Sequence, residues 1–182
     1  NPQGETYISY ALVGDCINIR GPPLKGIHSD SLGNLINWDL DPYWTGQGVD
    51  NNWSTPDNWD TGTVPLSNSI ITFDGIIGTN PNKDSVVDAS FQGTIASLTI
   101  DGYTGTITLA KNLTITGNIA LVTGTLEAGS QTITVGGNWA NQGGTFHAGT
   151  STVVFYDASK TSYILGNNTF YNLTCLTPGK TI

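Results

Sequence analysis

The sequence repeats itself at residues 113–132, LTITGNIALVTGTLEAGSQT, and residues 133–152, ITVGGNWANQGGTFHAGTST. Without a gap, nine of the twenty aligned positions are identical, and four others exchange one apolar residue for another. A fixed period near twenty, built from short alternating runs that glycine separates, is typical of coils repeated along an axis. The repeat therefore predicts an all-β fold, a right-handed parallel β-helix (β-solenoid) with coils of about 20 residues.

Within each coil, the alternation assigns a direction to every side chain. Apolar residues at every second position are expected to point into the coil, and the threonines between them to point to solvent. The inward set is Leu113, Ile115, Ile119, Leu121 and Leu126, and the outward set is Thr114, Thr116 and Thr125. One coil cannot bury its apolar face alone, so neighbouring coils stabilise each other and the end coils present bare strand edges.

The repeat extends beyond the two matched units. Residues 105–109 correspond to residues 124–128 one coil later, and residues 98–100 correspond to residues 113–115. With these correspondences, the first coil is expected to be a few residues shorter than the two that follow. About four to five coils are expected in total, which at roughly 4.8 Å per coil gives a stack on the order of 20–25 Å long.

Charge and turn residues divide the chain into three parts. Residues 1–42 form an N-terminal segment to which the sequence assigns no fold, with a strand-like run at residues 7–19 and a mixed stretch at residues 32–40. Residues 43–84 are rich in Trp, Asn, Asp, Gly and Pro, and they are expected to cap the coils. Residues 85–182 hold the solenoid coils.

The composition disfavours several classes of partner. The formal net charge is −8 with only six Lys and Arg residues, so the basic surface that nucleic-acid binding requires is missing. An anionic membrane surface is disfavoured for the same reason. No apolar run is long enough for a membrane-spanning helix, so no membrane insertion is expected. The low lysine content, with 26 Thr and 23 Gly, favours an extracellular location.

Trp44, Trp53 and Trp59 lie in the capping segment and allow two interpretations. In the first, the three indole rings cover the end of the coils as an apolar plug. In the second, they form a platform on which a sugar ring stacks. The plug is the favoured interpretation, because large aromatic side chains bury more apolar area than any other residue type.

A calcium ion is the one cofactor for which the sequence offers ligands. Asp50, Asn51, Asn52, Asp57 and Asp60 supply hard oxygen atoms of the kind that Ca²⁺ binds. Their spacing does not match an EF-hand loop, and Asp and Asn are expected in turns, where they accept backbone hydrogen bonds. We therefore expect no cofactor and no metal ion.

The two cysteines, Cys16 and Cys175, lie near opposite ends of the sequence. A solenoid between them makes a bond within one chain difficult, because bridged Cα atoms lie within roughly 7 Å of each other. A bond between successive subunits, or an N-terminal strand that runs back along the coils, would bring them together. Two unpaired thiols are the other interpretation.

Catalysis is not expected. Some parallel β-helices degrade polysaccharides, but the lyases among them need a basic residue beside an acidic calcium site, and Arg20 is the only Arg and lies outside the coils. A hydrolase would need two carboxylates about 5–10 Å apart across a cleft, and the acidic pairs of this chain lie in turn-rich segments. His147 takes the place of Glu127 in the repeat, which predicts an exposed side chain.

The block at residues 44–73, followed by LTITGN at 113–118, GGNWANQGGTFHAGTSTVVF at 136–155 and FYNLT at 170–174, resembles a family of large secreted bacterial surface proteins. These are repeat-built β-solenoid proteins of the adhesin, filamentous-haemagglutinin-like or autotransporter-passenger type. The resemblance covers about residues 43–182. It implies a scaffold on the bacterial cell surface and no common set of catalytic residues.

We therefore expect a non-enzymatic, extracellular structural or adhesive β-solenoid, a section or subunit of a bacterial surface fibre that assembles end to end. Its partners would be copies of itself or neighbouring repeats. In the filament version, the strand around residues 7–19 completes the open edge near residues 170–182 of the next subunit. The alternative is a glycan-binding or polysaccharide-degrading β-helix module with a cell-surface glycan as partner.

Overall fold

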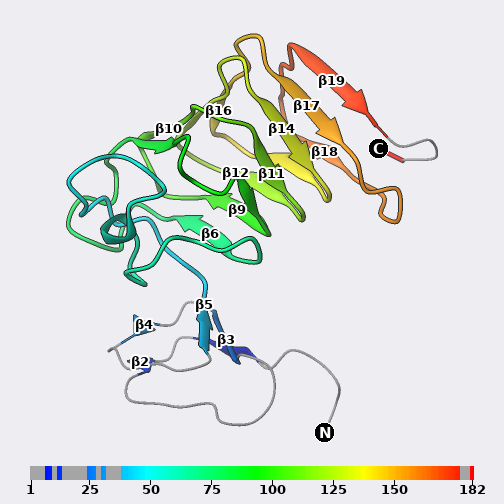
Figure 1. Ribbon diagram of the computed structural model, residues 1–182. Coiled ribbons are helices and arrows are strands. Elements are labelled where there is room, and N and C mark those ends of the chain that lie inside the picture. Colours follow the sequence, from blue (N-terminus) through cyan, green and yellow to red (C-terminus); the bar gives the residue numbers. More distant parts are fainter. Residues whose placement is uncertain (1–6, 10–11, 14–23, 28–29, 32–37, 177–180) are drawn as a thin grey trace, which may run out of the picture.

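The computed structural model describes residues 7–9, 12–13, 24–27, 30–31, 38–176 and 181–182, with side-chain surroundings from residue 41 onward. Its main body is a parallel β-solenoid of about five turns (Figure 1). Within the described residues the only helical element is the single 3₁₀ turn η1, Pro56–Asn58. The predicted all-β solenoid with coils of about 20 residues is confirmed.

Three parallel sheets form the sides of the solenoid, and each complete coil contributes one strand to each sheet. Sheet I consists of β7 (Ser85–Val87), β10 (Thr106–Leu109), β13 (Thr125–Glu127) and β16 (Thr145–His147). Sheet II consists of β8 (Thr94–Ile95), β11 (Leu113–Ile115), β14 (Thr132–Val135), β17 (Thr152–Phe155) and β19 (Asn172–Cys175). Sheet III consists of β6 (Ile70–Phe73), β9 (Ser97–Ile100), β12 (Ile119–Leu121), β15 (Trp139–Asn141) and β18 (Ile164–Leu165).

The core is a set of apolar columns that run along the solenoid axis. Leu113 pairs with Ile133, and Ile133 pairs with Val153, so equivalent inward residues stack from coil to coil. All three are buried, whereas Thr114, which follows Leu113 in β11, is half-buried on the outer face. The predicted inward and outward sets are confirmed. Because side chains alternate across a strand, a register slip of one residue would expose every column at once.

Of the two correspondences predicted for the first coil, one is confirmed, because Thr106 pairs with Thr125 and Ile107 with Leu126. The other, of residues 98–100 with residues 113–115, is wrong. Residues 98–100 pair with residues 119–121 in sheet III, whereas residues 113–115 belong to sheet II, where Thr114 pairs with Thr94. In sheet II the first coil is therefore twenty residues long, which is the length of the coil that follows, and it is not shorter as predicted. Residues 98–100 and residues 113–115 both read Leu-Thr-Ile, so alternation alone cannot tell which side of the coil each strand belongs to.

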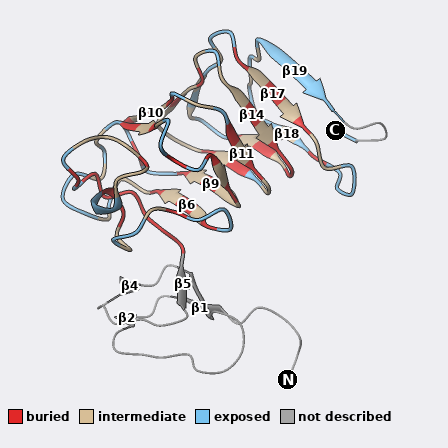
Figure 2. Ribbon diagram, viewed as in Figure 1, coloured by how far each residue is buried: buried red, intermediate tan, exposed pale blue. Residues whose placement is uncertain are grey.

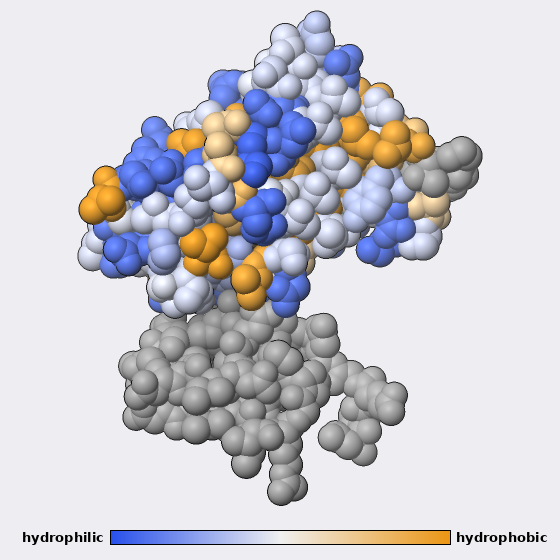
Figure 3. All heavy atoms as spheres, viewed as in Figure 1, coloured by the Kyte–Doolittle hydropathy of each residue, from blue (hydrophilic) through white to orange (hydrophobic). Residues whose placement is uncertain are grey.

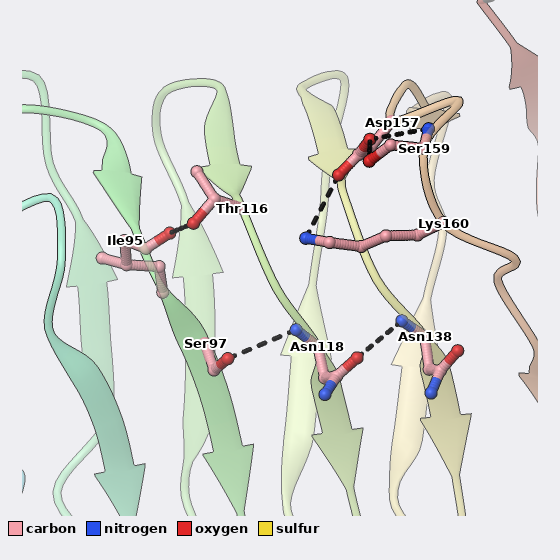
Figure 4. A network of polar contacts seen from close by, with 8 residues as sticks. All are labelled: Ile95, Ser97, Thr116, Asn118, Asn138, Asp157, Ser159 and Lys160. Atoms are coloured by element: carbon pink, nitrogen blue, oxygen red, sulfur yellow. Dashed lines mark hydrogen bonds and ion pairs between the residues drawn. The ribbon is translucent and has the colours of Figure 1, made fainter. Parts of the chain in front are cut away.

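One identity in the repeat, Asn118 with Asn138, is explained by a polar ladder at the corner between sheets II and III. Asn118 Oδ1 accepts a hydrogen bond from the backbone N–H of Asn138 at 2.8 Å, and Asn138 Oδ1 accepts one from that of Tyr163 at 2.9 Å. Ser97 Oγ accepts the corresponding hydrogen bond from Asn118 at 3.3 Å (Figure 4). Each side-chain oxygen thus accepts a hydrogen bond from a backbone N–H of the next coil. At this corner the side chains take the place of the hydrogen bonds that backbone carbonyls make within the sheets.

A glycine pair explains another identity. Gly129 and Gly149 occupy equivalent corners with φ values of 58° and 55°, in the left-handed region that favours glycine. A Cβ atom on Gly149 would lie 2.3 Å from the carbonyl oxygen of Gly129, so the two coils could not approach as they do. Only glycine meets both requirements at this corner.

The N-terminal strands are also parallel. β1 (Tyr7–Ser9), β3 (Leu24–Ile27) and β5 (Trp38–Leu40) form a three-stranded sheet in that order, and β2 (Leu12–Val13) pairs with β4 (Asp30–Ser31). The strand-like run predicted at residues 7–19 thus begins with β1 and β2, and its part from residue 14 lies outside the described residues. β5 leads directly into the capping segment.

The capping segment fills the N-terminal end of the solenoid with aromatic rings. The indole rings of Trp44 and Trp53 stack on the ring of Phe73, with centroid distances of 5.5 and 5.7 Å, and the ring of Trp59 meets it edge-on. The three Trp residues are at most 2% exposed. This aromatic cluster continues the apolar columns beyond the first coil. Because β6 belongs to sheet III, residues 43–84 supply a strand as well as the cap.

Candidate interaction surface at the C-terminal coil

The N-terminal edge of sheet III is closed by the chain's own backbone. Residues 42–44 run parallel to β6: Thr72 N–H donates to Pro42 O at 3.1 Å, and Trp44 N–H donates to Thr72 O at 3.0 Å. Ile70 N–H donates to Asp41 Oδ1 at 3.1 Å. These hydrogen bonds occupy the donors and acceptors that an edge strand would otherwise present to another chain.

The N-terminal edge of sheet I is closed in the same way by residues 51–53. Val86 N–H donates to Asn51 O at 2.8 Å, and Trp53 N–H donates to Val86 O at 2.9 Å. The carboxylate of Asp88 fastens this segment, because it accepts hydrogen bonds from Ser54 N–H at 3.0 Å and Ser54 Oγ at 2.8 Å. Burial acts to raise the pKa of Asp88, but these hydrogen bonds outweigh it and lower that pKa below its usual value.

The N-terminal edge of sheet II is closed by one side chain. The N–H and C=O of Thr94 in β8 point away from β11, because the carbonyl oxygens of the neighbouring Gly93 and Ile95 accept hydrogen bonds from the N–H groups of Thr114 and Thr116. The amide of Gln92 pairs with both groups: its Oε1 accepts from Thr94 N–H at 2.8 Å, and its Nε2 donates to Thr94 O. The side-chain amide thus takes the place of a neighbouring strand.

The C-terminal end differs. β19 is the outermost described strand of sheet II and pairs only with β17. Its Leu173 continues the column of Leu113, Ile133 and Val153, yet it is 46% exposed, whereas those three are at most 1% exposed. Figure 2 shows β19 as an exposed strand, and Figure 3 shows apolar side chains reaching the surface at this end. Further exposed apolar residues here are Tyr163, Leu165, Tyr171, Leu176 and Ile182.

Sheet I is one strand short at the same end. Thirteen residue positions separate Trp139 of β15 from Thr152 of β17, and a strand of sheet I lies between them. Eight positions separate Ile164 of β18 from Asn172 of β19, and no strand lies between them. β16 is therefore the outermost described strand of sheet I, whereas sheet II continues for one further strand, β19.

Phe170 covers part of the core that this missing strand leaves open. Its ring packs edge-on against Trp139 at a centroid distance of 5.3 Å and lies 5.8 Å from the ring of Phe146. Trp139 is fully buried, as its place in the repeat predicts. Phe146 and Phe170 are only partly buried, so the aromatic group at this end is thinner than the cap at the other end.

Two hollows flank this aromatic group. The first, of about 420 Å³, lies along β16 and is lined by Phe146, His147, Ala148, Gly149, Thr169, Phe170 and Tyr171. The second, of about 510 Å³, is lined by Asn141, Gln142, Gly143, Gly144, Gly166 and Asn167. Neither lining contains an acidic residue, Lys or Arg. His147 Nδ1 lies 2.9 Å from Glu127 Oε2 on the preceding coil; His147 is exposed, as the repeat predicts, and Glu127 is half-buried.

A tight polar turn lengthens the coil before β18. Asp157 Oδ1 accepts hydrogen bonds from Ser159 Oγ at 2.6 Å and Ser159 N–H at 3.0 Å, and Asp157 Oδ2 lies 3.1 Å from Lys160 Nζ (Figure 4). The hydrogen bond from the Ser159 hydroxyl, followed by those from Lys160 and the Ser159 backbone, lowers the pKa of Asp157 to about 2. This turn is exposed and shapes the corner from which the short final half-coil starts.

The predicted aromatic residues all lie in the cap. Each indole N–H of Trp44, Trp53 and Trp59 donates to a partner inside the protein: to Lys83 O, Ser85 Oγ and Trp53 O, respectively. With their rings buried, the indole faces are covered by other side chains. The plug is the arrangement that the structure adopts, and a sugar platform built from these rings would require the cap to open.

The carboxylates of two candidate calcium ligands, Asp50 and Asp60, accept backbone hydrogen bonds within the capping segment. Asp50 Oδ1 accepts from Asn52 N–H at 3.0 Å, and Asp60 Oδ1 accepts from Tyr43 N–H at 2.7 Å. The hydrogen bond from the Asn52 backbone is the main cause of the lowered pKa of Asp50. The hub of this segment is the fully buried Asn58, whose side chain bonds to Gly48 N–H, Asp50 O and Asn52 O. Among the described residues, no three His, Cys, Asp or Glu side chains are grouped closely enough to hold a metal ion.

Cys175 is the last residue of β19, where its thiol is exposed and free. It follows Phe155 in an inward column, so its exposure reflects the open end of sheet II. Cys16, the other half of the predicted pair, lies outside the described residues. Gln92 and Asp88, which help to close the strand edges at the N-terminal end, were not predicted as functional residues from the sequence.

Searches of protein-family models, curated proteins and solved structures found no match for this chain. The resemblance to bacterial surface proteins therefore stays a prediction. No helix within the described residues is long and apolar enough to cross a membrane.

Proposed function

We propose that this chain is a non-enzymatic, extracellular structural or adhesive element that associates end to end through its C-terminal coil. The observation that carries the proposal is the contrast between the ends of one solenoid. The N-terminal edges of all three sheets are occupied by the chain's own atoms, whereas β16 and β19 present edges beside exposed apolar residues.

Open parallel edges of this kind favour β-augmentation, in which another strand adds to the ladder and its side chains continue the core. Leu173 is half-exposed in a column whose other members are buried, and covering it removes apolar surface from water at about 25 cal/mol per Å². The partner that fits is another coil, in a second copy of the chain or in a neighbouring repeat. Because the cap closes the N-terminal end of the coils, a head-to-tail fibre of copies needs a strand that precedes the cap to complete the open edge, as in the filament version of the sequence analysis.

The location on a bacterial cell surface is part of the proposal. It is supported by the low lysine content, the abundance of Thr and Gly, and the resemblance of residues 43–182 to secreted surface proteins. The absence of catalytic activity is likewise part of the proposal, and it is supported by the resemblance of residues 43–182 to a family without a common set of catalytic residues.

Sedimentation velocity of the full chain over a wide concentration range, with electron microscopy of the same samples, tests the proposal. We expect concentration-dependent association and linear particles. A chain that stays monomeric at every concentration would overturn end-to-end association.

The second candidate function is glycan binding. The observation that favours it is the hollow lined by Asn141, Gln142 and Asn167, whose amides resemble those that bind sugar hydroxyls. A glycan array with the full chain tests it, with Gln142→Ala as the matched variant, because Gln142 is exposed and lies in this hollow. Binding that this substitution removes would support the glycan module, and no binding to any glycan would reject it.

A further inference from the structure

We propose that residues 48–52 of the capping segment form a binding site for a monovalent cation, which the chain fills with its own ammonium group, that of Lys83. The inference goes beyond the proposed function and holds whether or not the chain associates end to end. It starts from two hydrogen bonds of one side chain: Lys83 Nζ donates to Gly48 O at 2.9 Å and to Asp50 O at 2.6 Å.

The carbonyl oxygens of this loop converge on donors inside the protein. Besides the two bonds from Lys83, Asn58 Nδ2 donates to Asp50 O at 3.2 Å and to Asn52 O at 2.9 Å. The carbonyls of residues 48, 50 and 52 therefore meet one ammonium group and one amide, and Asn58 is fully buried. Backbone carbonyl oxygens gathered in this way are the ligands with which proteins replace the water shell of a cation.

The backbone of Lys83 is fixed where its side chain can reach the loop. Lys83 O accepts hydrogen bonds from Trp44 Nε1 at 3.0 Å and Tyr103 Oη at 2.9 Å, and Lys83 N–H donates to Asn80 O at 3.0 Å. Gly46 lies against the start of the side chain, since a Cβ atom on Gly46 would lie 2.9 Å from Cβ of Lys83. The ammonium group is thus held next to the loop by four neighbouring residues.

The cation that fits is a primary ammonium group and not calcium. Ca²⁺ takes roughly six to eight oxygen ligands, usually with carboxylates among them. The carboxylate of Asp50 instead accepts hydrogen bonds from Asn52 N–H at 3.0 Å and Asn52 Nδ2 at 3.1 Å. The two oxygens that bind Lys83 are neutral carbonyls, which suit a single positive charge that carries N–H donors.

The site helps to close the N-terminal edge of sheet I. The carbonyl between two of the convergent ones, Asn51 O, accepts from Val86 N–H at 2.8 Å, and Trp53 N–H donates to Val86 O at 2.9 Å. The same short segment therefore binds the cation on one side and β7 on the other. Removal of the cation should loosen the pairing with β7, because the segment then loses the bonds that hold its inner carbonyls.

The test is chemical rescue of Lys83→Ala, which removes a group of the size of n-propylammonium. Hydrogen exchange at the amides of Trp53 and Val86 is measured by NMR. We expect exchange to become faster by about a factor of ten, since a hydrogen bond from a charged group contributes enough to stability for a change of that size. Added n-propylammonium should restore the protection. Tetramethylammonium at the same ionic strength should not, because it carries the charge but no N–H group.

Two further variants separate the site from other effects of a lysine. Lys83→Met keeps an unbranched side chain but has no charge and no donor, so it should lose protection and should not be rescued. Lys160→Ala removes the same charge from an exposed turn at the other end, and it should exchange like the wild type. Faster exchange in Lys160→Ala would mean that net charge is responsible, which overturns the site.

Three other results would also overturn the inference: unchanged exchange in Lys83→Ala, equal rescue by tetramethylammonium, and rescue by calcium but not by n-propylammonium. If Lys83→Ala does not fold without additives, refolding is followed by near-UV circular dichroism of the buried tryptophans. Folding in n-propylammonium but not in tetramethylammonium then supports the cation site, and folding in neither rejects it.

Discussion

The two ends of this solenoid differ in how the outer backbone groups of their last strands are paired. Every strand at an end of a coil stack has unpaired backbone groups on its outer side. At the N-terminal end, two backbone segments and the amide of Gln92 pair with these groups, and an aromatic cluster covers the core. At the C-terminal end, β16 and β19 remain outermost and Leu173 is half-exposed. The coils are therefore generic, and the specific features lie at the ends.

The largest effect is expected from damage to the closed end. Trp53 is fully buried between Phe73 and Phe91 and donates to Ser85 Oγ. Trp53→Ala should lower the free energy of unfolding by about 3–5 kcal/mol, because it leaves a cavity and an unpaired acceptor in the cap. Urea denaturation measures the change. Val49→Ala, at a residue of the same segment that is 99% exposed, should have no effect; equal losses in both variants would contradict the role of the cap.

The second prediction concerns acid. The folded pKa of Asp88 lies below its unfolded value near 3.8, so its stabilising contribution is present above that pH and is lost as pH falls through the lowered folded pKa. We expect the cap to loosen in this window, which hydrogen exchange at Trp53 and Ser54 would detect. Asp88→Asn should exchange faster near neutral pH and show less additional loosening in acid.

Asp88→Ala should be worse than Asp88→Asn, since it leaves Ser54 N–H without an acceptor, at a cost of about 1–3 kcal/mol. An Asp88→Asn chain whose acid response matches the wild type would show that other carboxylates, such as the pKa-lowered Asp50, control the cap.

The third prediction turns a closed edge into an open one. Gln92→Ala removes both hydrogen bonds to Thr94 and should cost about 0.5–1.5 kcal/mol. More informatively, it leaves β8 with an unpaired edge, so the variant should associate at lower concentration than the wild type in sedimentation experiments. Gln47→Ala, at an exposed glutamine of the capping segment, is the control. Unchanged association of Gln92→Ala would mean that the amide is not needed to block this edge.

The sequence predicted the coils well because alternation is a local signal. Leu113 and Thr114 alternate in the sequence as they do in the structure, and the identity of Asn118 with Asn138 is explained by the ladder that their side chains form. The wrong correspondence of residues 98–100 has a physical origin: strands of different sheets share one pattern, and the corner between β8 and β9 contains no glycine to mark it.

The contacts and the missing strand at the two ends could not be predicted from a local sequence pattern. Asp88 and Ser54 are 34 residues apart, and each looks like an ordinary turn residue. Gln92 closes an edge only because β8 turns Thr94 outward, which depends on the register of sheet II. The exposed C-terminal edge was foreseen, but the missing strand of sheet I depends on the short path from Ile164 to Asn172, which has no counterpart in the repeat.

The smallest effect on stability is expected at the open end, and it carries the most information about function. Leu173→Lys changes a side chain that is 46% exposed, so the free energy of unfolding should change by no more than about 0.5 kcal/mol. Association, in contrast, should be lost, because a second coil would have to bury an unpaired ammonium group in an apolar column. Leu66→Lys is the matched control, since Leu66 is 61% exposed but lies in the capping segment. If both variants associate like the wild type, the exposed column is not a contact surface, and the difference between the two ends has no role in assembly. If only Leu173→Lys fails to associate while both remain folded, the open end of the solenoid is the surface through which the chain meets its partner.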